Sequence, residues 1–143
     1  MMKKYLVAID GSDNSKRAAG FALHQARGDN DIEITLIHIV NVRKELYNYS
    51  PLMDIRDIQQ IALEQGMEAV KDQAVLFENE GINVNKVVVE GDPGYKIAEC
   101  ARENGYHQII IGTRGLSDLK GLVLGSVSHK VVHFAKCPVT LVK

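Results

Sequence analysis

The chain of 143 residues is 45% hydrophobic and 24% charged, which predicts one globular domain over residues 1–143. Its 17 basic and 18 acidic residues leave a net charge of −1, which argues against a nucleic-acid partner, because nucleic-acid-binding proteins carry a basic field. No apolar stretch approaches the ~20 residues of a membrane span. The first apolar run stops at Asp10, too early for a secretory signal, so we expect a cytoplasmic protein with no membrane partner.

The chain begins with a strand and a helix. A nearly continuous apolar run at residues 5–9 predicts a strand that is covered on both faces. A stripe of small apolar residues between 18 and 26 then predicts a helix. Ser12 or Asp13 is the expected N-cap of this helix, and Gly28 marks its end.

The second strand is expected at residues 32–40, where His38 is interpreted as a hydrogen-bonded core histidine. The polar residues 43–57 predict a mobile loop. A longer apolar stripe over residues 63–77 predicts the second helix, which ends before Gly81.

The third strand is expected at residues 84–89, and a third helix follows it. Asp92 suits the N-cap of that helix and Pro93 its first position, and Gly105 marks its end. The fourth strand, at residues 108–112, is apolar almost throughout.

A fourth helix over residues 127–135 and a last strand at Val139–Val142 complete the pattern. Regular alternation of strands and helices predicts an α/β fold with a doubly wound, five-stranded parallel sheet. We expect the strand order 3-2-1-4-5, with four flanking helices, as in Rossmann-like folds. In such sheets, the ligand crevice lies at the C-terminal strand ends where the strand order reverses. That point falls between strands 1 and 4.

A glycine motif follows the fourth strand and lies at this predicted crevice. Gly112 and Gly115 are separated by two residues, and after nine further residues come Gly125 and Ser126, at the start of a helix. Glycines let the backbone approach a ligand closely, and a helix N-terminus offers N–H donors and a partial positive charge. The pattern therefore predicts a phosphate site and a nucleotide ligand.

Other motifs fit the sequence less well. A Walker A loop requires Lys directly before Ser or Thr, but here Gly125 precedes Ser126. A phosphoacceptor receiver domain would need an aspartate at the end of the third strand, where this chain has Glu90. His129 and His133 are four residues apart on the last helix, but no third metal ligand is near in sequence, so no metal site is predicted.

Over its whole length, the chain resembles the universal stress proteins. The resemblance rests on the aspartate closing strand 1, on His38-Ile39-Val40 closing strand 2, on Gly91-Asp92-Pro93, and on the short last strand after Cys137-Pro138. The ATP-binding branch of that family is marked by the pattern G-x2-G-x9-G-[ST], which the glycine motif matches without a gap.

The resemblance also implies which residues hold the nucleotide. Those expected beside the adenosine are Ala8, Asp10, Ile39 and Ile111. Those expected around the ribose and phosphates are Ser12, Gly112, Arg114, Gly115, Gly125, Ser126, Val127 and Ser128. Three of these residues have a second interpretation that stays open: Ser12 as a helix cap, Arg114 as a solvated loop arginine and Asp10 as a turn aspartate that bonds its own backbone.

The sequence thus predicts a protein that binds ATP, with Mg²⁺ carried by the phosphates, and that acts as a nucleotide sensor or regulator. No catalytic residue and no protein metal ligand are predicted, because only Arg114 and Asp10 accompany the glycine cradle, and phosphoryl transfer needs more groups than these. Two alternatives stay open. One is a slow ATPase or autophosphorylating enzyme using Ser126 or Ser128, and the other is a nucleotide-free interaction module.

The last strand predicts assembly. Val139–Val142 is short and apolar and is expected at an edge of the sheet, and an uncovered apolar edge favours pairing with another chain. Universal stress proteins often dimerise through this strand, so the resemblance adds to the physical argument. We therefore expect a homodimer in which this strand pairs antiparallel with its symmetry mate.

Overall fold

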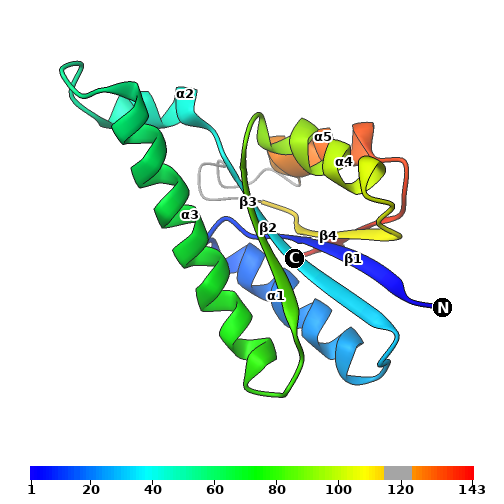
Figure 1. Cartoon of the computed structure of the whole chain (residues 1–143). Helices are drawn as coiled ribbons and strands as arrows, with labels where there is room; N and C mark the ends of the chain where they lie inside the picture. Colours follow the sequence, from blue (N-terminus) through cyan, green and yellow to red (C-terminus); the bar gives the residue numbers. More distant parts are fainter. Residues whose placement is uncertain (115–123) are drawn as a thin grey trace.

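The computed structural model describes residues 1–114 and 124–143 of the chain (Figure 1). At its centre lies a parallel sheet in the order β3-β2-β1-β4-β5, which confirms the predicted doubly wound α/β fold. The strands are β1 (Lys3–Ala8), β2 (Ile32–Val40), β3 (Val84–Glu90), β4 (Gln108–Gly112) and β5 (Val139–Val142). The helices are α1 (Asp13–Arg27), α2 (Val42–Glu45), the 3-10 helix η1 (Leu46–Asn48), α3 (Ile55–Glu78), α4 (Pro93–Glu103) and α5 (Ser126–Phe134).

β1 is the central strand, and the direction of winding reverses beside it. On one side it pairs with β2, where Ala8 lies opposite Ile37, and on the other with β4, where Val7 lies opposite Ile110. Figure 1 shows α1 and α3 on one face of the sheet and α4 and α5 on the other. The C-terminal ends of β1 and β4 therefore border the topological switch point, as predicted.

Successive residues of the strands face two separate hydrophobic cores. Val7 and Leu36 are fully buried in the core beneath α1 and α3, together with Phe77. Leu6 points to the opposite face and packs in the core beneath α4 and α5, together with Ile97. Because both faces are covered, the strands are apolar at nearly every position rather than at alternate ones.

The turn between β1 and α1 is determined by its local sequence. Gly11 has a φ of +84°, which glycine adopts without the steric cost of a Cβ. Ser12 is the N-cap of α1, and its Oγ accepts the N–H of Ser15 at 3.1 Å. Of the two predicted caps, Ser12 is therefore correct, and Asp13 is the first residue of the helix. Asp92 caps α4, as predicted.

The predicted mobile loop at residues 43–57 is wrong. α2 and η1 occupy residues 42–48, and α3 begins within the segment. Asn41 caps α2 by accepting the N–H of Lys44 at 3.3 Å, and Asp54 caps α3 by accepting the N–H of Arg56 at 2.8 Å. Most side chains of these short helices are exposed, so their sequence contains no apolar stripe from which a helix could be predicted. The described residues thus contain five α-helices where four were predicted. None of them is long and apolar enough to cross a membrane.

Candidate functional site

A cavity of about 490 Å³ opens where the C-terminal ends of β1, β2 and β4 meet. This volume falls within the ~300–1,000 Å³ of typical small-molecule sites. Most of the residues predicted around a nucleotide line it: Ala8, Asp10, Ile39, Ile111, Gly112, Arg114, Val127 and Ser128. The fold therefore brings together residues that lie more than a hundred positions apart in the sequence.

Asp10 fits both of its interpretations. Its Oδ1 accepts the main-chain N–H of Ser12 at 2.9 Å, which is the contact of a turn aspartate. Asp10 also lines the cavity. An ionised carboxylate accepts several hydrogen bonds, so the turn contact leaves it able to accept another from a ligand hydroxyl.

Three other residues that were predicted around the nucleotide do not line the cavity. Ser12 is 7% exposed, and its side chain caps α1. Gly125 is buried, and its N–H donates to the main-chain oxygen of Thr113 at 2.6 Å. Ser126, the first residue of α5, is exposed but does not line the cavity. Gly115 lies outside the described residues.

Ser128 lines the cavity, but its hydroxyl faces inward. The Oγ donates to the main-chain oxygen of Thr113 at 2.8 Å, with the oxygen of Gly125 at 3.1 Å, and the residue is only 2% exposed. The hydroxyl hydrogen is therefore engaged by the main chain. Any contact of Ser128 with a phosphate would have to come from its main-chain N–H, in the first turn of the helix.

Gly112 of the motif has a packing cause of its own. A Cβ on Gly112 would lie 2.7 Å from the Cβ of Asn14 and 2.9 Å from its main-chain carbon, so only glycine lets α1 approach β4 this closely. Gly125 has a φ of −73°, which any L-residue adopts. The backbone conformation at position 125 therefore does not itself require glycine.

Sequence reasoning missed the wall that α2 and α3 contribute. Its residues are Asn41, Lys44, Glu45, Ala62, Gln65, Gly66 and Ala69. The rule that ligands bind at C-terminal strand ends could have found Asn41, which directly follows β2. Nothing in the sequence pointed to Gln65, because its place depends on how α3 packs across the sheet.

Gly66 could have indicated a close packing contact of this helix, because glycine inside a helix costs ~1 kcal/mol relative to alanine. Its Cβ would lie 2.6 Å from Cδ2 of His38, so α3 passes directly over the His38 ring. Nδ1 of that ring lies 2.7 Å from the main-chain oxygen of Ile9, so the predicted hydrogen bond is present, but His38 is only half-buried and is not a core residue. His38 and Gly66 both line the cavity.

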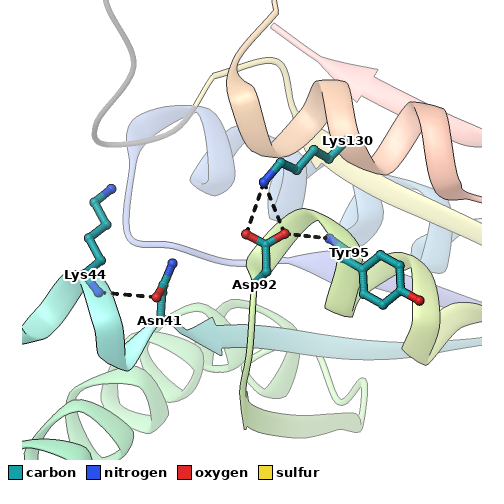
Figure 2. A network of polar contacts seen from close by, with 5 residues as sticks. All are labelled: Asn41, Lys44, Asp92, Tyr95 and Lys130. Atoms are coloured by element: carbon teal, nitrogen blue, oxygen red, sulfur yellow. Dashed lines mark hydrogen bonds and ion pairs between the residues drawn. The ribbon is translucent and has the colours of Figure 1, made fainter.

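Polar contacts fix the helices around the cavity (Figure 2). Asn41 holds the start of α2 through the N–H of Lys44. Asp92 holds the start of α4, and both of its carboxylate oxygens accept from Nζ of Lys130 in α5, at 3.1 and 3.3 Å. Pro93, directly after Asp92, lines the cavity. The ion pair therefore joins the two helices that cover this face of the sheet.

Within the described residues, the histidines and cysteines outside the cavity form neither a metal-binding group of three or more side chains nor a disulfide. His129 and His133 are both exposed, and residues 1–114 and 124–143 contain no group of three or more His, Cys, Asp or Glu side chains that could hold a metal ion. Cys100 and Cys137 are free cysteines, and partial burial raises the pKa of both thiols above its ordinary value.

Comparisons with known proteins agree on one family. A profile described as the universal stress protein family matches residues 1–143. Universal stress protein YxiE of Bacillus subtilis is 34% identical over 149 aligned residues, covering 100% of both chains. The solved structure of MJ0577, a protein of Methanocaldococcus jannaschii, has a TM-score of 0.81 at 25% identity and covers 100% of this chain and 96% of its own. A family protein from Arabidopsis thaliana with AMP bound has a TM-score of 0.71 at 24% identity, covering 99% and 91%.

Proposed function

Because the chain belongs to the universal stress protein family, we propose that it binds an adenine nucleotide at the C-terminal edge of its sheet and acts as a nucleotide-dependent regulator. ATP is the proposed ligand, with Mg²⁺ carried by its phosphates, and the cytoplasm is the proposed compartment. The AMP found in the Arabidopsis thaliana protein supports an adenosine compound as the ligand class.

The observation that carries this proposal is the convergence of apolar, acidic and basic groups on one cavity. Three apolar residues of the cavity wall offer a surface on which the planar adenine ring can pack: Ala8, Ile39 and Ile111, each at most 8% exposed. Asp10 can accept a hydrogen bond from a ribose hydroxyl. Arg114 and the first turn of α5 supply positive charge and N–H donors for the phosphates.

The cavity lining is compatible with an Mg²⁺ ion that the nucleotide phosphates carry, with Glu45 as the cavity carboxylate not assigned to the ribose. This ion usually keeps several waters and binds through one or two carboxylates together with substrate phosphates, rather than in an all-protein cage. Glu45 lines the cavity and is a carboxylate of the required kind. In the proposed complex, the phosphates supply the remaining oxygen ligands, and the ion neutralises part of their charge.

The contacts of Ser128 argue against this residue as a phosphoacceptor, which leaves Ser126 as the candidate of the autophosphorylation alternative. A phosphoacceptor hydroxyl must reach the terminal phosphate, whereas the Ser128 hydroxyl is buried and donates to the main-chain oxygen of Thr113. The nucleotide-free alternative draws support from Gly112, whose glycine has a packing cause. A direct measurement of binding is therefore the decisive test.

The proposal includes a homodimer. β5 lies at the edge of the sheet and pairs with β4 alone, and Leu141 in this strand is 40% exposed. Antiparallel pairing with a second copy would cover this edge and continue the sheet across a two-fold axis.

The test is calorimetric titration of the purified protein with ATP, ADP, AMP and adenosine, after identification of any nucleotide that copurifies. Arg114→Ala should weaken ATP binding about tenfold, since a charge-assisted hydrogen bond contributes ~1.5–3 kcal/mol. Arg43→Ala is the matched control, because Arg43 is exposed in α2 and does not line the cavity. Equal ATP affinity in both variants, or no binding of any adenine compound, would contradict the proposal.

A further inference from the structure

Thr113 joins the two described ends of the glycine motif, the end of β4 at Gly112 and the start of α5 at Gly125. Its main-chain oxygen accepts the N–H of Gly125 at 2.6 Å and the hydroxyl of Ser128 at 2.8 Å. Its own N–H donates to the main-chain oxygen of Val142 at 2.9 Å, and it is 8% exposed. Thr113 therefore ties the end of β4 to the start of α5 and to β5.

A fourth contact of Thr113 comes from α1. Nδ2 of Asn14 donates to Oγ1 of Thr113 at 3.0 Å, and Asn14 is 7% exposed. The Oδ1 of Asn14 accepts from the guanidinium of Arg17, whose Nε donates to the main-chain oxygen of Lys143 at 2.8 Å. Because a guanidinium can only donate, it fixes which end of the amide faces Thr113. Asn14 is thus held in one orientation on both sides.

Neither Asn14 nor Thr113 lines the cavity, but the residues beside them do. Gly112 and Arg114 flank Thr113 in the chain, Ser128 is bonded to it, and all three line the cavity wall. A Cβ at Gly112 would collide with Asn14, so the close approach that makes the bond possible depends on this glycine. The buried bond is therefore one residue away from the groups proposed to contact phosphate.

We propose that Asn14 is a positioning residue for nucleotide phosphates and acts through Thr113. We name the four residues Asn14, Thr113, Gly125 and Ser128 the Thr113 clasp. The clasp holds Arg114 and the first turn of α5 in the relative position that phosphate binding requires. This inference rests on the proposed function and adds to it the residues that set affinity for the phosphates rather than for adenosine.

The physical basis is preorganisation. A ligand that must order a loop before binding loses affinity, whereas a loop already held in the bound geometry does not carry that cost. Removing the Thr113 hydroxyl leaves a buried amide N–H of Asn14 without its partner, which favours rearrangement at this position. Adenosine, which has no phosphates, gains nothing from the clasp. The loss should therefore be specific to phosphate-bearing ligands.

The experiment compares Thr113→Val with Thr113→Ser by calorimetry, using ATP and adenosine as the two probes. Thr113→Val removes the hydroxyl at nearly constant volume and should weaken ATP binding about tenfold, with adenosine affinity unchanged. Thr113→Ser keeps the hydroxyl and should restore ATP binding. Thr140→Val is the matched control, because that hydroxyl accepts from Gln108 in the same sheet, away from the loop.

Asn14→Ala removes the same bond from the α1 side, so it must reproduce the ATP-selective loss even if Thr113→Val does not fold. An equal loss for ATP and adenosine, or no loss for either, would overturn the clasp. A wild-type protein that binds neither ligand would overturn the proposed function instead. In that case, hydrogen exchange of the Gly125 amide decides whether the clasp exists, since it should be faster in Thr113→Val than in Thr113→Ser.

Discussion

Alanine in place of glycine should have opposite effects at two helical positions, Gly20 and Gly66. In a helix interior, this change alone stabilises by ~0.5–1 kcal/mol, because the unfolded chain loses freedom and the helix propensity rises. A Cβ on Gly20 in α1 would meet nothing within 4 Å. Gly20→Ala should therefore raise the free energy of unfolding by the full ~0.5–1 kcal/mol.

At Gly66 the added methyl group has no room. It would lie 2.6 Å from Cδ2 of His38 and 3.1 Å from Cγ1 of Val88. The His38 ring cannot turn away without losing the contact of its Nδ1 with the oxygen of Ile9 at 2.7 Å. Overpacking of this kind costs ~1–3 kcal/mol. Since the propensity gain is common to both variants, Gly66→Ala should be less stable than Gly20→Ala by about this overpacking cost.

Urea unfolding followed by circular dichroism measures both free energies, and equal m-values would show that the two variants unfold from comparable states. Because Gly66 and His38 line the cavity, ATP affinity should fall in Gly66→Ala and stay unchanged in Gly20→Ala. If Gly66→Ala proved as stable as Gly20→Ala, the close packing of α3 over His38 would be refuted, together with the α3 wall of the cavity.

Three further predictions concern the sheet edge, the cysteines and the ion pair between α4 and α5. The main-chain oxygens of Pro138 and Val142 face β4, and since alternate residues of a strand point their N–H and C=O groups to opposite sides, the N–H of Leu141 faces the open edge. Leu141→Pro removes this N–H and should therefore give monomers in light scattering that still bind ATP. A persistent dimer would refute pairing through β5. Burial raises the pKa of the Cys100 thiol, so its alkylation by iodoacetamide should be slower at pH 7 than that of a free thiol. Its rate should still be rising with pH above the ordinary pKa of ~8.5, where the rate of a free thiol levels off, and a plateau at that pH would contradict the shift. Asp92→Ala should lower the free energy of unfolding by ~1 kcal/mol, because α4 loses its N-cap. Lys130→Ala should lower it by less, because it removes only an exposed ion pair, which contributes at most ~1 kcal/mol. Equal losses of stability in thermal melts of the two variants would contradict the capping role of Asp92.

The strands could be predicted because nearly continuous apolar runs that alternate with helices are buried in a parallel sheet covered on both faces. Their order was expected from the doubly wound fold class, and the structure has that order. Helices with an apolar stripe were equally visible, including the one that carries Phe77 into the core. The segment of α2 and η1 was not visible, since Tyr47 is 91% exposed there and the apolar residues follow no helical period. Only the helix starts left a trace in the sequence of this region, because Asn41 and Asp54 are residue types that commonly cap helices, and both do so here.

For the site, the sequence predicted the strand ends and missed the side wall. Asp10, Ile39 and Ile111 were implied by the family resemblance, and they line the cavity because parallel strands end at one edge of the sheet. Gln65 could not be predicted in the same way, since its position depends on where a 24-residue helix crosses that edge. Sequence periodicity shows which face of α3 is buried, but it does not show which turn of the helix lies over the ligand crevice.

One glycine of the motif has a physical cause that concerns no ligand. Gly112 is required by the approach of Asn14, and Gly125 adopts an ordinary backbone conformation with its N–H bonded to Thr113. A protein without any nucleotide would need the same glycine at position 112, so the spacing of the motif alone does not separate a phosphate cradle from a packing solution. Arg114 does separate them: it is exposed, it lines the cavity, and none of the ion pairs between described residues uses its guanidinium. Loss of ATP affinity without loss of stability in Arg114→Ala would therefore assign the loop to a phosphate, whereas replacing a glycine would disturb packing and binding together.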